Sequence, residues 1–336
     1  MRQVLGGFSV VRALMFVLLL LPALQVLAAE PLASWREGPS RKAIEAFVVA
    51  VTQEGGPDYV APNERIAVFD NDGTLWSEQP LYFEVLFAMD EVKRLAPQHP
   101  QWRSQQPFKA VLENDHQALA AQGMDGLLKI VAATHSGMSS EDFIARSRSW
   151  LASARHPRTG KPYTEMVFQP MLELLGYLRD NGFRTYIVSG GEVAFMRAFA
   201  EEVYGIPPEQ VIGTTLDAAF QDQQGKLSIQ RLPKVLHNDD GPGKPVSIDS
   251  IIGRRPLLAF GNSDGDLQML QWTMAGKGRR FAALVHHTDA QREWAYDRKS
   301  SVGRLDKALD QAQANGWTVV DMASEWRRVH PFETPQ

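Results

Sequence analysis

The segment 66–75, which reads IAVFDNDGTL, decides the fold of this 336-residue chain. Its first four residues are apolar and rich in branched and aromatic side chains, which is typical of a buried parallel strand. Two aspartates, Asp70 and Asp72, follow directly, and the turn-forming Gly73 comes next. Only a bent loop lets both carboxylates face one ligand, where one can act as nucleophile while the other exchanges protons.

An oxygen-rich calcium loop is the main alternative for two aspartates at this spacing. The EF-hand pattern fails because Leu81 stands where a glutamate would close the loop. The motif therefore favours an enzyme over a calcium-binding loop.

Similar apolar runs that end in glycine or polar residues recur later in the chain. They predict strands within Arg184–Gly191, Arg255–Asp266, Arg280–His287 and Trp317–Met322. The amphipathic stretch Gln169–Asn181 precedes the first of these runs and completes a helix-to-strand unit. Because open parallel sheets place their sites beyond the carboxyl ends of the strands, we expect Asp70, Ser189 and the segment 262–266 to gather at one edge.

The segment between Trp76 and Thr164 has helical periodicity and few strand signals. It predicts helices over Glu84–Leu95, Lys109–Ala121, Gly126–Thr134 and Ser140–Ala152, separated by proline-rich connectors. A leading helix is expected over Ser40–Thr52 and a β-hairpin over Gly213–Leu232. We therefore predict a three-layer α/β core with a doubly wound parallel sheet (residues 30–75 and 165–336) and an inserted α-helical cap domain (residues 76–164).

The first 29 residues have the pattern of a secretory signal. Arg2 and Arg12 precede the apolar run Ala13–Leu21, and the small residues Ala28 and Ala29 follow. We expect cleavage there, a periplasmic location and no stable membrane association afterwards. An uncleaved anchor is the alternative, although the uninterrupted apolar run is short for a membrane span.

Composition narrows the chemistry further. A formal net charge of −4 gives no reason to expect nucleic acid as a partner. The chain has no cysteine, which excludes a thiol nucleophile and thiolate metal ligands. Any metal must therefore be held by oxygen or imidazole.

Four motifs in order resemble those of the haloacid dehalogenase superfamily, most closely its phosphoserine-phosphatase-like branch with an inserted helical cap. The motifs are Asp70–Thr74, the strand end Ser189–Gly191, Lys244 in Gly243–Pro245, and Gly261–Leu267. Together they extend from about Ile66 to Asp266, and their combination is far more specific than any one of them.

The resemblance implies a mechanism for hydrolysis of a small phosphorylated substrate. Asp70 would attack phosphorus to form an aspartyl-phosphate, while Asp72 would serve as general acid and then as general base. Ser189, the N–H of Gly190 and Lys244 would bind the phosphoryl oxygens. The resemblance also implies Mg²⁺, with a ligand set drawn from Asp70, the main-chain carbonyl of Asp72, Asn262 and Asp266.

Several assignments stay open at this level. Asn262 replaces the aspartate common in relatives, and asparagine offers a carbonyl oxygen without charge. Asp264 is as consistent with a turn or helix cap as with a functional role. Lys226 and Lys234 compete with Lys244, whose place before an apparent helix suits the role best.

The function has alternatives as well. The same motifs suit a phosphotransferase, and an inactive metal- or ligand-binding module would explain Asn262 as a loss.

The aromatic and acidic residues that follow the nucleophile loop are consistent either with recognition of a cationic amine or with packing of the insertion; they are Trp76, Tyr82, Phe83 and Glu84. The pair His286-His287 is expected to be structural because adjacent strand residues point to opposite faces.

Overall fold

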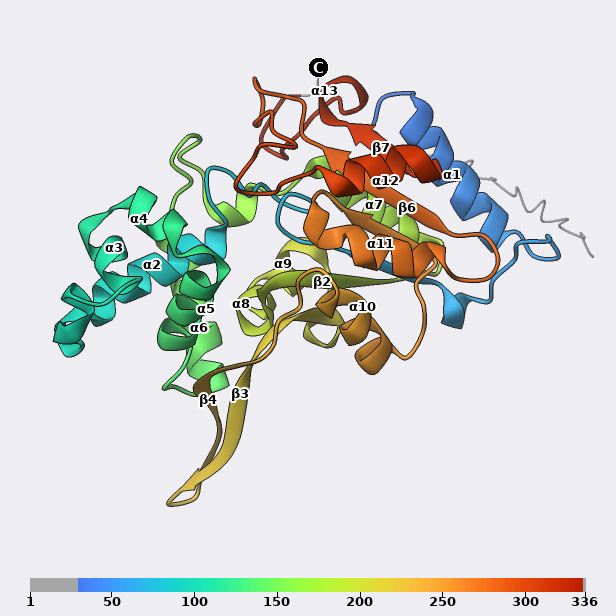
Figure 1. Ribbon diagram of the computed structural model, residues 1–336. Coiled ribbons are helices and arrows are strands. Elements are labelled where there is room, and N and C mark those ends of the chain that lie inside the picture. Colours follow the sequence, from blue (N-terminus) through green and yellow to red (C-terminus); the bar gives the residue numbers. More distant parts are fainter. Residues whose placement is uncertain (1–29, 335–336) are drawn as a thin grey trace, which may run out of the picture. The chain divides into compact units, whose positions relative to one another are not determined.

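The structure is a computed structural model and describes residues 30–334 (Figure 1). Its centre is a seven-stranded sheet in the order β4-β3-β2-β1-β5-β6-β7. The strands are β1 (Ile66–Phe69), β2 (Arg184–Glu192), β3 (Val211–Gln223), β4 (Lys226–His237), β5 (Leu258–Gly261), β6 (Phe281–His286) and β7 (Thr318–Asp321). All neighbours are parallel except β3 and β4. The predicted doubly wound α/β fold is confirmed, with an antiparallel hairpin at one edge.

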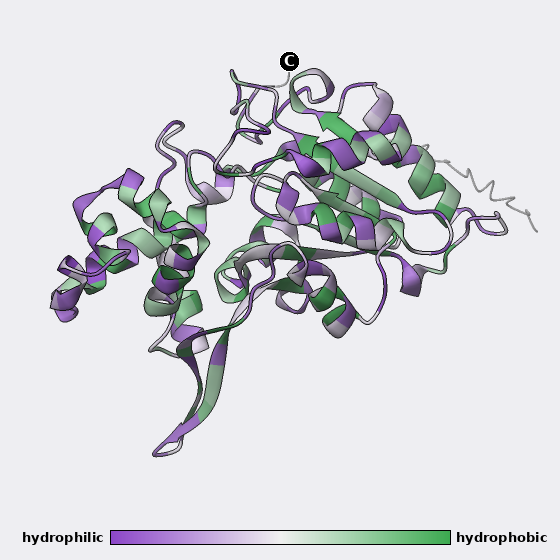
Figure 2. Cartoon of the chain, viewed as in Figure 1, coloured by the Kyte–Doolittle hydropathy of each residue, from purple (hydrophilic) through white to green (hydrophobic). Residues whose placement is uncertain are grey.

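Helices cover both faces of this sheet, so the core has three layers. The helices before the insertion and after it are α1 (Pro39–Thr52), α7 (Gln169–Asp180), α8 (Val193–Arg197), α9 (Ala200–Tyr204), α10 (Gly243–Ser247), α11 (Leu267–Met274), α12 (Lys307–Asn315) and α13 (Met322–Glu325). The hydrophobic cluster on one face includes α1 and α7, and the cluster on the other includes α11 and α12. Figure 2 shows that hydrophobic (green) and hydrophilic (purple) residues alternate along these helices.

The central strand β1 shows why its sequence reads as continuously apolar. Ala67 and Phe69 pack into the cluster with α1 and α7, whereas Ile66 and Val68 pack into the cluster with α11 and α12. All four side chains are fully buried because both faces of the strand are covered. Since β2 and β5 flank β1 on opposite sides, the chain reverses its winding direction at the carboxyl end of β1, where such folds bind their ligands.

The segment between β1 and α7 is helical, as predicted. Its helices are α2 (Phe83–Leu95), α3 (Phe108–Glu113), α4 (His116–Ala121), α5 (Gly123–Thr134) and α6 (Ser140–Ser153). The single helix expected over Lys109–Ala121 is wrong. Asn114 takes a left-handed conformation with φ 53° and ends α3, and the Asp115 side chain caps α4. That these helices form a separate cap domain over residues 76–164 stays a prediction.

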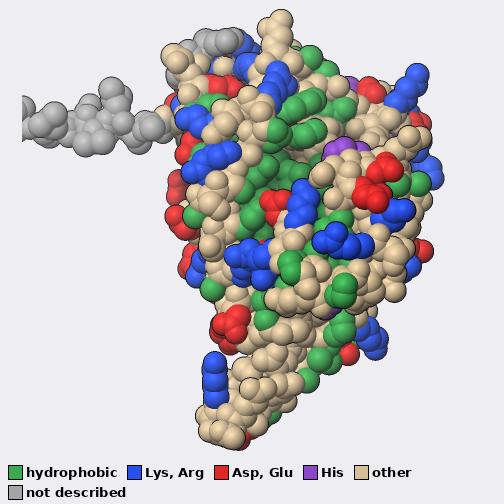
Figure 3. All heavy atoms as spheres, turned by 90° about the vertical axis from the view of Figure 1, so that its left-hand side faces the viewer, with side chains coloured by type: hydrophobic (Ala, Val, Ile, Leu, Met, Phe, Trp, Pro, Cys, Tyr) green, Lys and Arg blue, Asp and Glu red, His purple; other side chains and the backbone are tan. Residues whose placement is uncertain are grey.

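The hairpin of β3 and β4 connects the sheet to the inserted helices. It was expected over Gly213–Leu232, but β3 also pairs with β2 and so continues the core sheet. Farther along, the backbones of Arg231 and the α5–α6 connection bond to each other, with Gly137 N to Arg231 O at 2.9 Å and Arg231 N to Met138 O at 3.0 Å. Figure 1 shows the hairpin running past α5 and α6, and Figure 3 views this side, where basic and acidic side chains are interspersed with hydrophobic ones.

The expected signal, residues 1–29, lies outside the described part of the chain. Within residues 30–334, no helix combines the length and the apolar character that a membrane crossing requires.

Candidate active site

The loop after β1 places the first aspartate at the carboxyl edge of the sheet. Asp70 still donates its N–H to Phe260 O of β5 at 3.0 Å. The backbone then turns around Asn71 O, which accepts from the N–H groups of residues 74, 75 and 76. Gly73 has φ +74°, and a Cβ there would lie 2.1 Å from Asn262 Nδ2. Glycine is therefore required both by the turn and by the approach of the 262–266 segment.

Asp70 is held by a buried lysine. Lys244 Nζ donates to Asp70 Oδ1 at 2.6 Å and to Asp266 Oδ1 at 2.5 Å. All three side chains are buried. Burial opposes the charge of Lys244, but the two carboxylates outweigh it and raise its pKa, so the lysine is a permanent cation. Burial and the charge of Asp266 raise the pKa of Asp70, which Lys244 opposes.

Lys244 is thus the lysine that reaches the nucleophile position. Lys226 and Lys234 lie on β4 and are exposed. That Lys244 is the lysine that binds the phosphoryl oxygens stays a prediction.

Asp72 faces the same cavity in a different environment. Its Oδ1 accepts from the indole N–H of Trp76 at 2.8 Å. Burial raises the pKa of Asp72 to about 6; the Trp76 hydrogen bond opposes this, and the charge of Glu84 adds to it. A carboxyl group with a pKa near neutrality can both give and take a proton during turnover.

Glu84 is a second buried carboxylate beside Asp72. Burial raises the pKa of Glu84 to about 7, against the hydrogen bond that its Oε2 accepts from Glu192 N at 2.8 Å. His135 Nε2 lies 3.4 Å from Glu84 Oε1, but burial lowers the pKa of His135 to about 4. The imidazole is therefore neutral near pH 7 and gives Glu84 no positive charge, and the charge of Arg231 lowers the pKa of Glu84 only in part.

The end of β2 supplies the predicted phosphate-binding segment. Ser189 is buried, and its Oγ accepts from Gly191 N at 3.1 Å. Thr214 Oγ1 donates to Gly190 O at 2.7 Å, which fixes the peptide after Ser189. A Cβ on Gly191 would lie 3.0 Å from Glu84 Oε2 and 3.7 Å from Asp72 Oδ2, so this strand end adjoins both carboxylates.

One cavity brings most of the predicted residues together. Asp70, Asp72, Ser189, Gly190 and Lys244 all line it. A further wall comes from α5 and is apolar, formed by Met124, Leu127, Leu128 and Val131. This wall could not be predicted from the sequence, because helical periodicity alone does not say which element a helix will face.

The 262–266 segment forms a tight turn below the cavity. Asp266 Oδ2 accepts from the N–H groups of Asn262 at 2.9 Å and Ser263 at 3.0 Å, while its Oδ1 binds Lys244. Asp264 Oδ1 accepts from Asp306 N and Ala308 N, both at 2.9 Å, at the start of α12. Of the two roles considered for Asp264, the helix cap fits these contacts.

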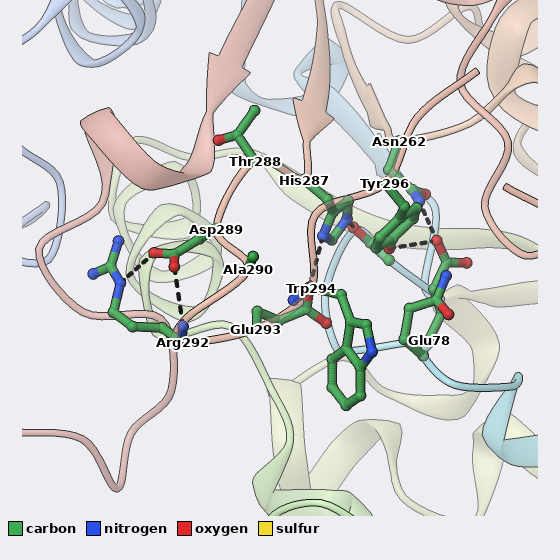
Figure 4. Close-up of polar contacts among 12 residues, drawn as sticks. Glu78, Asn262, His287, Thr288, Asp289, Ala290, Arg292, Glu293, Trp294 and Tyr296 are labelled. Atoms are coloured by element: carbon green, nitrogen blue, oxygen red, sulfur yellow. Dashed lines mark hydrogen bonds and ion pairs between the residues drawn. The ribbon is translucent and has the colours of Figure 1, made fainter. Parts of the chain in front are cut away.

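Asn262 makes two side-chain hydrogen bonds that fix its amide. Its Oδ1 accepts from Thr74 Oγ1 at 3.1 Å, and its Nδ2 donates to Glu78 Oε1 at 2.7 Å. The Tyr296 hydroxyl donates to the same Glu78 oxygen at 2.7 Å (Figure 4). Burial raises the pKa of Glu78 well above its usual value, the Tyr296 bond opposes this, and the charges of Asp72 and Asp70 add to it.

Glu78 and Tyr296 were missed at the sequence level. Tyr296 stacks on His287, whose Nε2 donates to Gly73 O at 2.8 Å. The loop 287–296 therefore supports the nucleophile turn, residues 70–73. His287 is buried and structural, as expected. No local pattern around Glu78 marks it, because its partners lie about two hundred residues away in the chain.

The donor set suits a hard divalent cation. The described residues include no group of three or more His, Asp or Glu side chains already arranged to hold a metal. Mg²⁺, however, takes only one or two carboxylates and completes its shell with carbonyl oxygens and water. The buried charges of Asp70, Asp72 and Glu78 repel one another, and a cation among them would relieve that repulsion. The roles of Asp70, the Asp72 carbonyl, Asn262 and Asp266 as ligands stay predictions.

Comparisons with known proteins agree with this arrangement of motifs. The haloacid dehalogenase-like hydrolase family matches residues 67–271, more than half of the chain, and the chain belongs to that family. No curated protein matches the sequence.

Similar solved structures include a protein with unknown function from Bordetella pertussis Tohama I, which is 16% identical with a TM-score of 0.49 over 77% of this chain and 99% of that chain. A conserved functionally unknown protein from Anaerococcus prevotii DSM 20548 is 18% identical with a TM-score of 0.49 over 83% and 91%. A probable phosphoserine phosphatase from Vibrio cholerae is 15% identical with a TM-score of 0.39 over 79% and 62%. Likenesses at this level say nothing of the substrate.

Proposed function

We propose that this hydrolase is a Mg²⁺-dependent phosphatase that cleaves small phosphomonoesters through an aspartyl-phosphate on Asp70. The observation that carries the proposal is the contrast between two aspartates on one loop. Asp70 is bonded to a permanent cation, Lys244, whereas Asp72 has a pKa near 6 and lines the same cavity. A nucleophile and a proton carrier are the two groups that this hydrolysis needs.

In the first step, an oxygen of Asp70 forms a bond to phosphorus while the bond from phosphorus to the ester oxygen breaks. Lys244 engages Oδ1 of Asp70, which leaves Oδ2 for the attack. Protonated Asp72 gives its proton to the departing alcohol. Ser189 and the N–H of Gly190 are the groups in the cavity that can bind the phosphoryl oxygens.

In the second step, Asp72 takes a proton from water, and the water oxygen bonds to phosphorus as the bond to Asp70 breaks. Inorganic phosphate leaves and both aspartates return to their starting states. Trp76 positions Asp72 through its indole N–H in both steps.

Mg²⁺ would be held by Asp70, the main-chain carbonyl of Asp72, Asn262 and Asp266. When bound, it neutralises charge on the phosphoryl group and on the surrounding carboxylates. Both oxygens of Asp266 already accept hydrogen bonds, so the main contribution of Asp266 is to hold Lys244 and the 262–266 turn in place.

The cavity also limits the substrate class. Among the described residues that line it, Lys244 is the single lysine or arginine, while Glu78, Glu84, Glu192 and Asp240 add acidic groups. A second anionic group on the substrate would meet like charge without a partner. The apolar wall of α5 favours instead an alcohol that is apolar, uncharged or cationic.

A panel of monoesters tests this preference. We expect kcat/KM for 4-nitrophenyl phosphate and phosphoethanolamine to exceed that for phosphoserine by about tenfold or more, because the phosphoserine carboxylate meets uncompensated acidic groups. Phosphoserine as the best substrate would overturn the substrate class while leaving the phosphatase assignment intact.

The basic experiment compares wild type with Asp70→Asn on this panel, with Mg²⁺ and with a chelator. Phosphate release that requires Mg²⁺ and is lost in Asp70→Asn would support the proposal. A folded wild type that binds Mg²⁺ and hydrolyses no ester would favour the binding-module alternative.

We also propose export to the periplasm, which rests on the signal pattern of residues 1–29. Fractionation of expressing cells tests it, since the processed protein should be released with the periplasmic contents.

A further inference from the structure

We propose that Glu78 supplies the negative charge that the metal site lacks because Asn262 is neutral. This inference rests on the proposed function, in which a divalent cation binds beside Asp70. Glu78 lies in the connection between β1 and α2, outside the four motifs that identify the site. It lines the same cavity as Asp70 and Asp72.

The contact between Glu78 and Asn262 is direct. Asn262 Nδ2 donates to Glu78 Oε1 at 2.7 Å, so the neutral side chain is bonded to a carboxylate. Both groups adjoin the nucleophile turn, since a Cβ on Gly73 would lie 2.1 Å from Asn262 Nδ2 and 2.4 Å from Glu78 Oε1. The carboxylate of Glu78 thus lies next to Asn262, the neutral residue that replaces a charged aspartate.

A charge balance explains why the site needs this carboxylate. Asp70 and Asp266 share one lysine, so that group retains a single net negative charge. Asp72 offers the metal only its uncharged main-chain carbonyl, and the side chain of Asn262 is neutral as well. A divalent cation bound to these residues alone would leave an excess positive charge, which ionised Glu78 removes.

The protein holds Glu78 in one orientation. Tyr296 OH and Asn262 Nδ2 both donate to Oε1, and within the described residues no group donates to Oε2. A Cβ on Gly303 would overlap the carboxylate, so the side chain also packs against that backbone. Oε2 is therefore the atom left to face a cation or its bound water.

The loop 287–296 is the support for this arrangement. Tyr296 N donates to His287 O at 3.0 Å, and Arg158 bonds to the carbonyl oxygens of Ala290, Gln291 and Glu293. Figure 4 shows Tyr296 and His287 stacked beside Glu78, with Trp294 and Glu293 on the same loop. Arg158 comes from the connection before α7, so the loop is tied to the same segment that follows the inserted helices.

The test measures Mg²⁺ binding by isothermal titration calorimetry on the full protein, without substrate. We expect Glu78→Gln, which keeps the shape of the side chain, to weaken Mg²⁺ binding by about tenfold to a hundredfold. Introducing Asn262→Asp into Glu78→Gln should restore most of that loss, because the charge returns to the adjacent position.

Asn262→Asp in the wild-type background gives an independent reading. There the new carboxylate would face Glu78 and lose the hydrogen bond to it, so we expect no gain in Mg²⁺ affinity. Tighter binding in this single variant, or wild-type affinity in Glu78→Gln, would overturn the role of Glu78. This variant keeps the proposal testable if Glu78→Gln does not fold.

The outcomes also separate this inference from the proposed function. Wild-type protein that binds no Mg²⁺ in the calorimeter would overturn both. In another outcome, the wild type binds Mg²⁺, Asp70→Asn abolishes activity, and Glu78→Gln binds Mg²⁺ as tightly as the wild type. That result would overturn the role of Glu78 alone. Exposed Glu165→Gln serves as the matched control and should bind as wild type.

Discussion

Two groups of buried carboxylates face the same cavity and differ in one respect. Asp70 and Asp266 share Lys244, which bonds to both. Asp72, Glu78 and Glu84 have no such cation, and burial raises the pKa of each. The difference separates two tasks. The lysine-bound group holds a positive charge against the nucleophile, while the second group holds carboxyls that are ready to exchange protons or to attract a cation.

After loss of the nucleophile Asp70 itself, removing the proton carrier should have the largest effect on activity. Asp72→Asn keeps the size of the side chain and its contact with Trp76, yet it cannot give a proton. We expect kcat/KM, which reports the first transfer and not the later hydrolysis of the aspartyl-phosphate, to fall by about 10²–10⁴ for alkyl esters. For 4-nitrophenyl phosphate the loss should be much smaller, because that leaving group departs without protonation. An equal loss for both kinds of ester, measured by phosphate release, would mean that Asp72 is not the general acid.

Removing the shared cation should have the largest effect on stability. Lys244→Met leaves the carboxylates of Asp70 and Asp266 buried without a balancing positive charge, so we expect the free energy of unfolding to fall by about 3–5 kcal/mol near pH 7. Urea unfolding measures this change. The matched control is Lys226→Met on the exposed hairpin, which should stay within about 0.5 kcal/mol of wild type. Similar small changes in both variants would show that Lys244 is not needed to balance the two aspartates.

For Glu84, a member of the second group, we expect the free energy of unfolding to fall as the pH rises. The pKa of Glu84 is about 7 in the folded protein against an ordinary value of 4.5, so the folded state binds its proton more tightly than the unfolded chain does. The stabilising effect of that proton is full below the ordinary value and is lost as pH rises towards 7. Glu84→Gln removes this loss and should gain about 1–3 kcal/mol relative to wild type between about pH 5 and pH 8.

Glu91 is the contrasting carboxylate when the free energy of unfolding is measured by urea unfolding as a function of pH. It accepts hydrogen bonds from Arg94 and Arg146, which lower its pKa against the effect of burial. Its stabilising contribution is present above the ordinary pKa and lost as pH falls, so Glu91→Gln should lower stability at pH 7. The stabilities of Glu84→Gln and Glu91→Gln, each relative to wild type, should therefore change in opposite directions with pH. A change in the same direction would contradict the distinction between carboxylates that are paired with a cation and those that are not.

From the sequence we predicted the three residues of the first group and Asp72 of the second, and we named Glu84 without deciding its role, but we missed Glu78. Asp70, Ser189 and Asp266 each follow an apolar strand, and the carboxyl ends of neighbouring parallel strands meet at one edge. Lys244 could be chosen over Lys226 because it precedes a helix, and the structure places it against Asp70. Local pattern and sheet topology are sufficient for such residues.

Glu78 could not be found in this way. Its partners Asn262 and Tyr296 come together only because the loop 287–296 folds behind the nucleophile turn, and no periodic pattern encodes that loop. The break of the expected helix at Asn114 had a similar cause, because a left-handed residue interrupts an otherwise helical pattern. That the inserted helices form a cap over the cavity stays a prediction from the sequence.

The most direct test of the central claim is to look for phosphate on Asp70. Wild-type protein is mixed with Mg²⁺ and a monoester, quenched in acid after a few milliseconds, digested and analysed by mass spectrometry. The account predicts a phosphorylated peptide that contains Asp70 and disappears in Asp70→Asn. Turnover without phosphate on that peptide at any quench time, or phosphate on another residue, would contradict the mechanism proposed for this site.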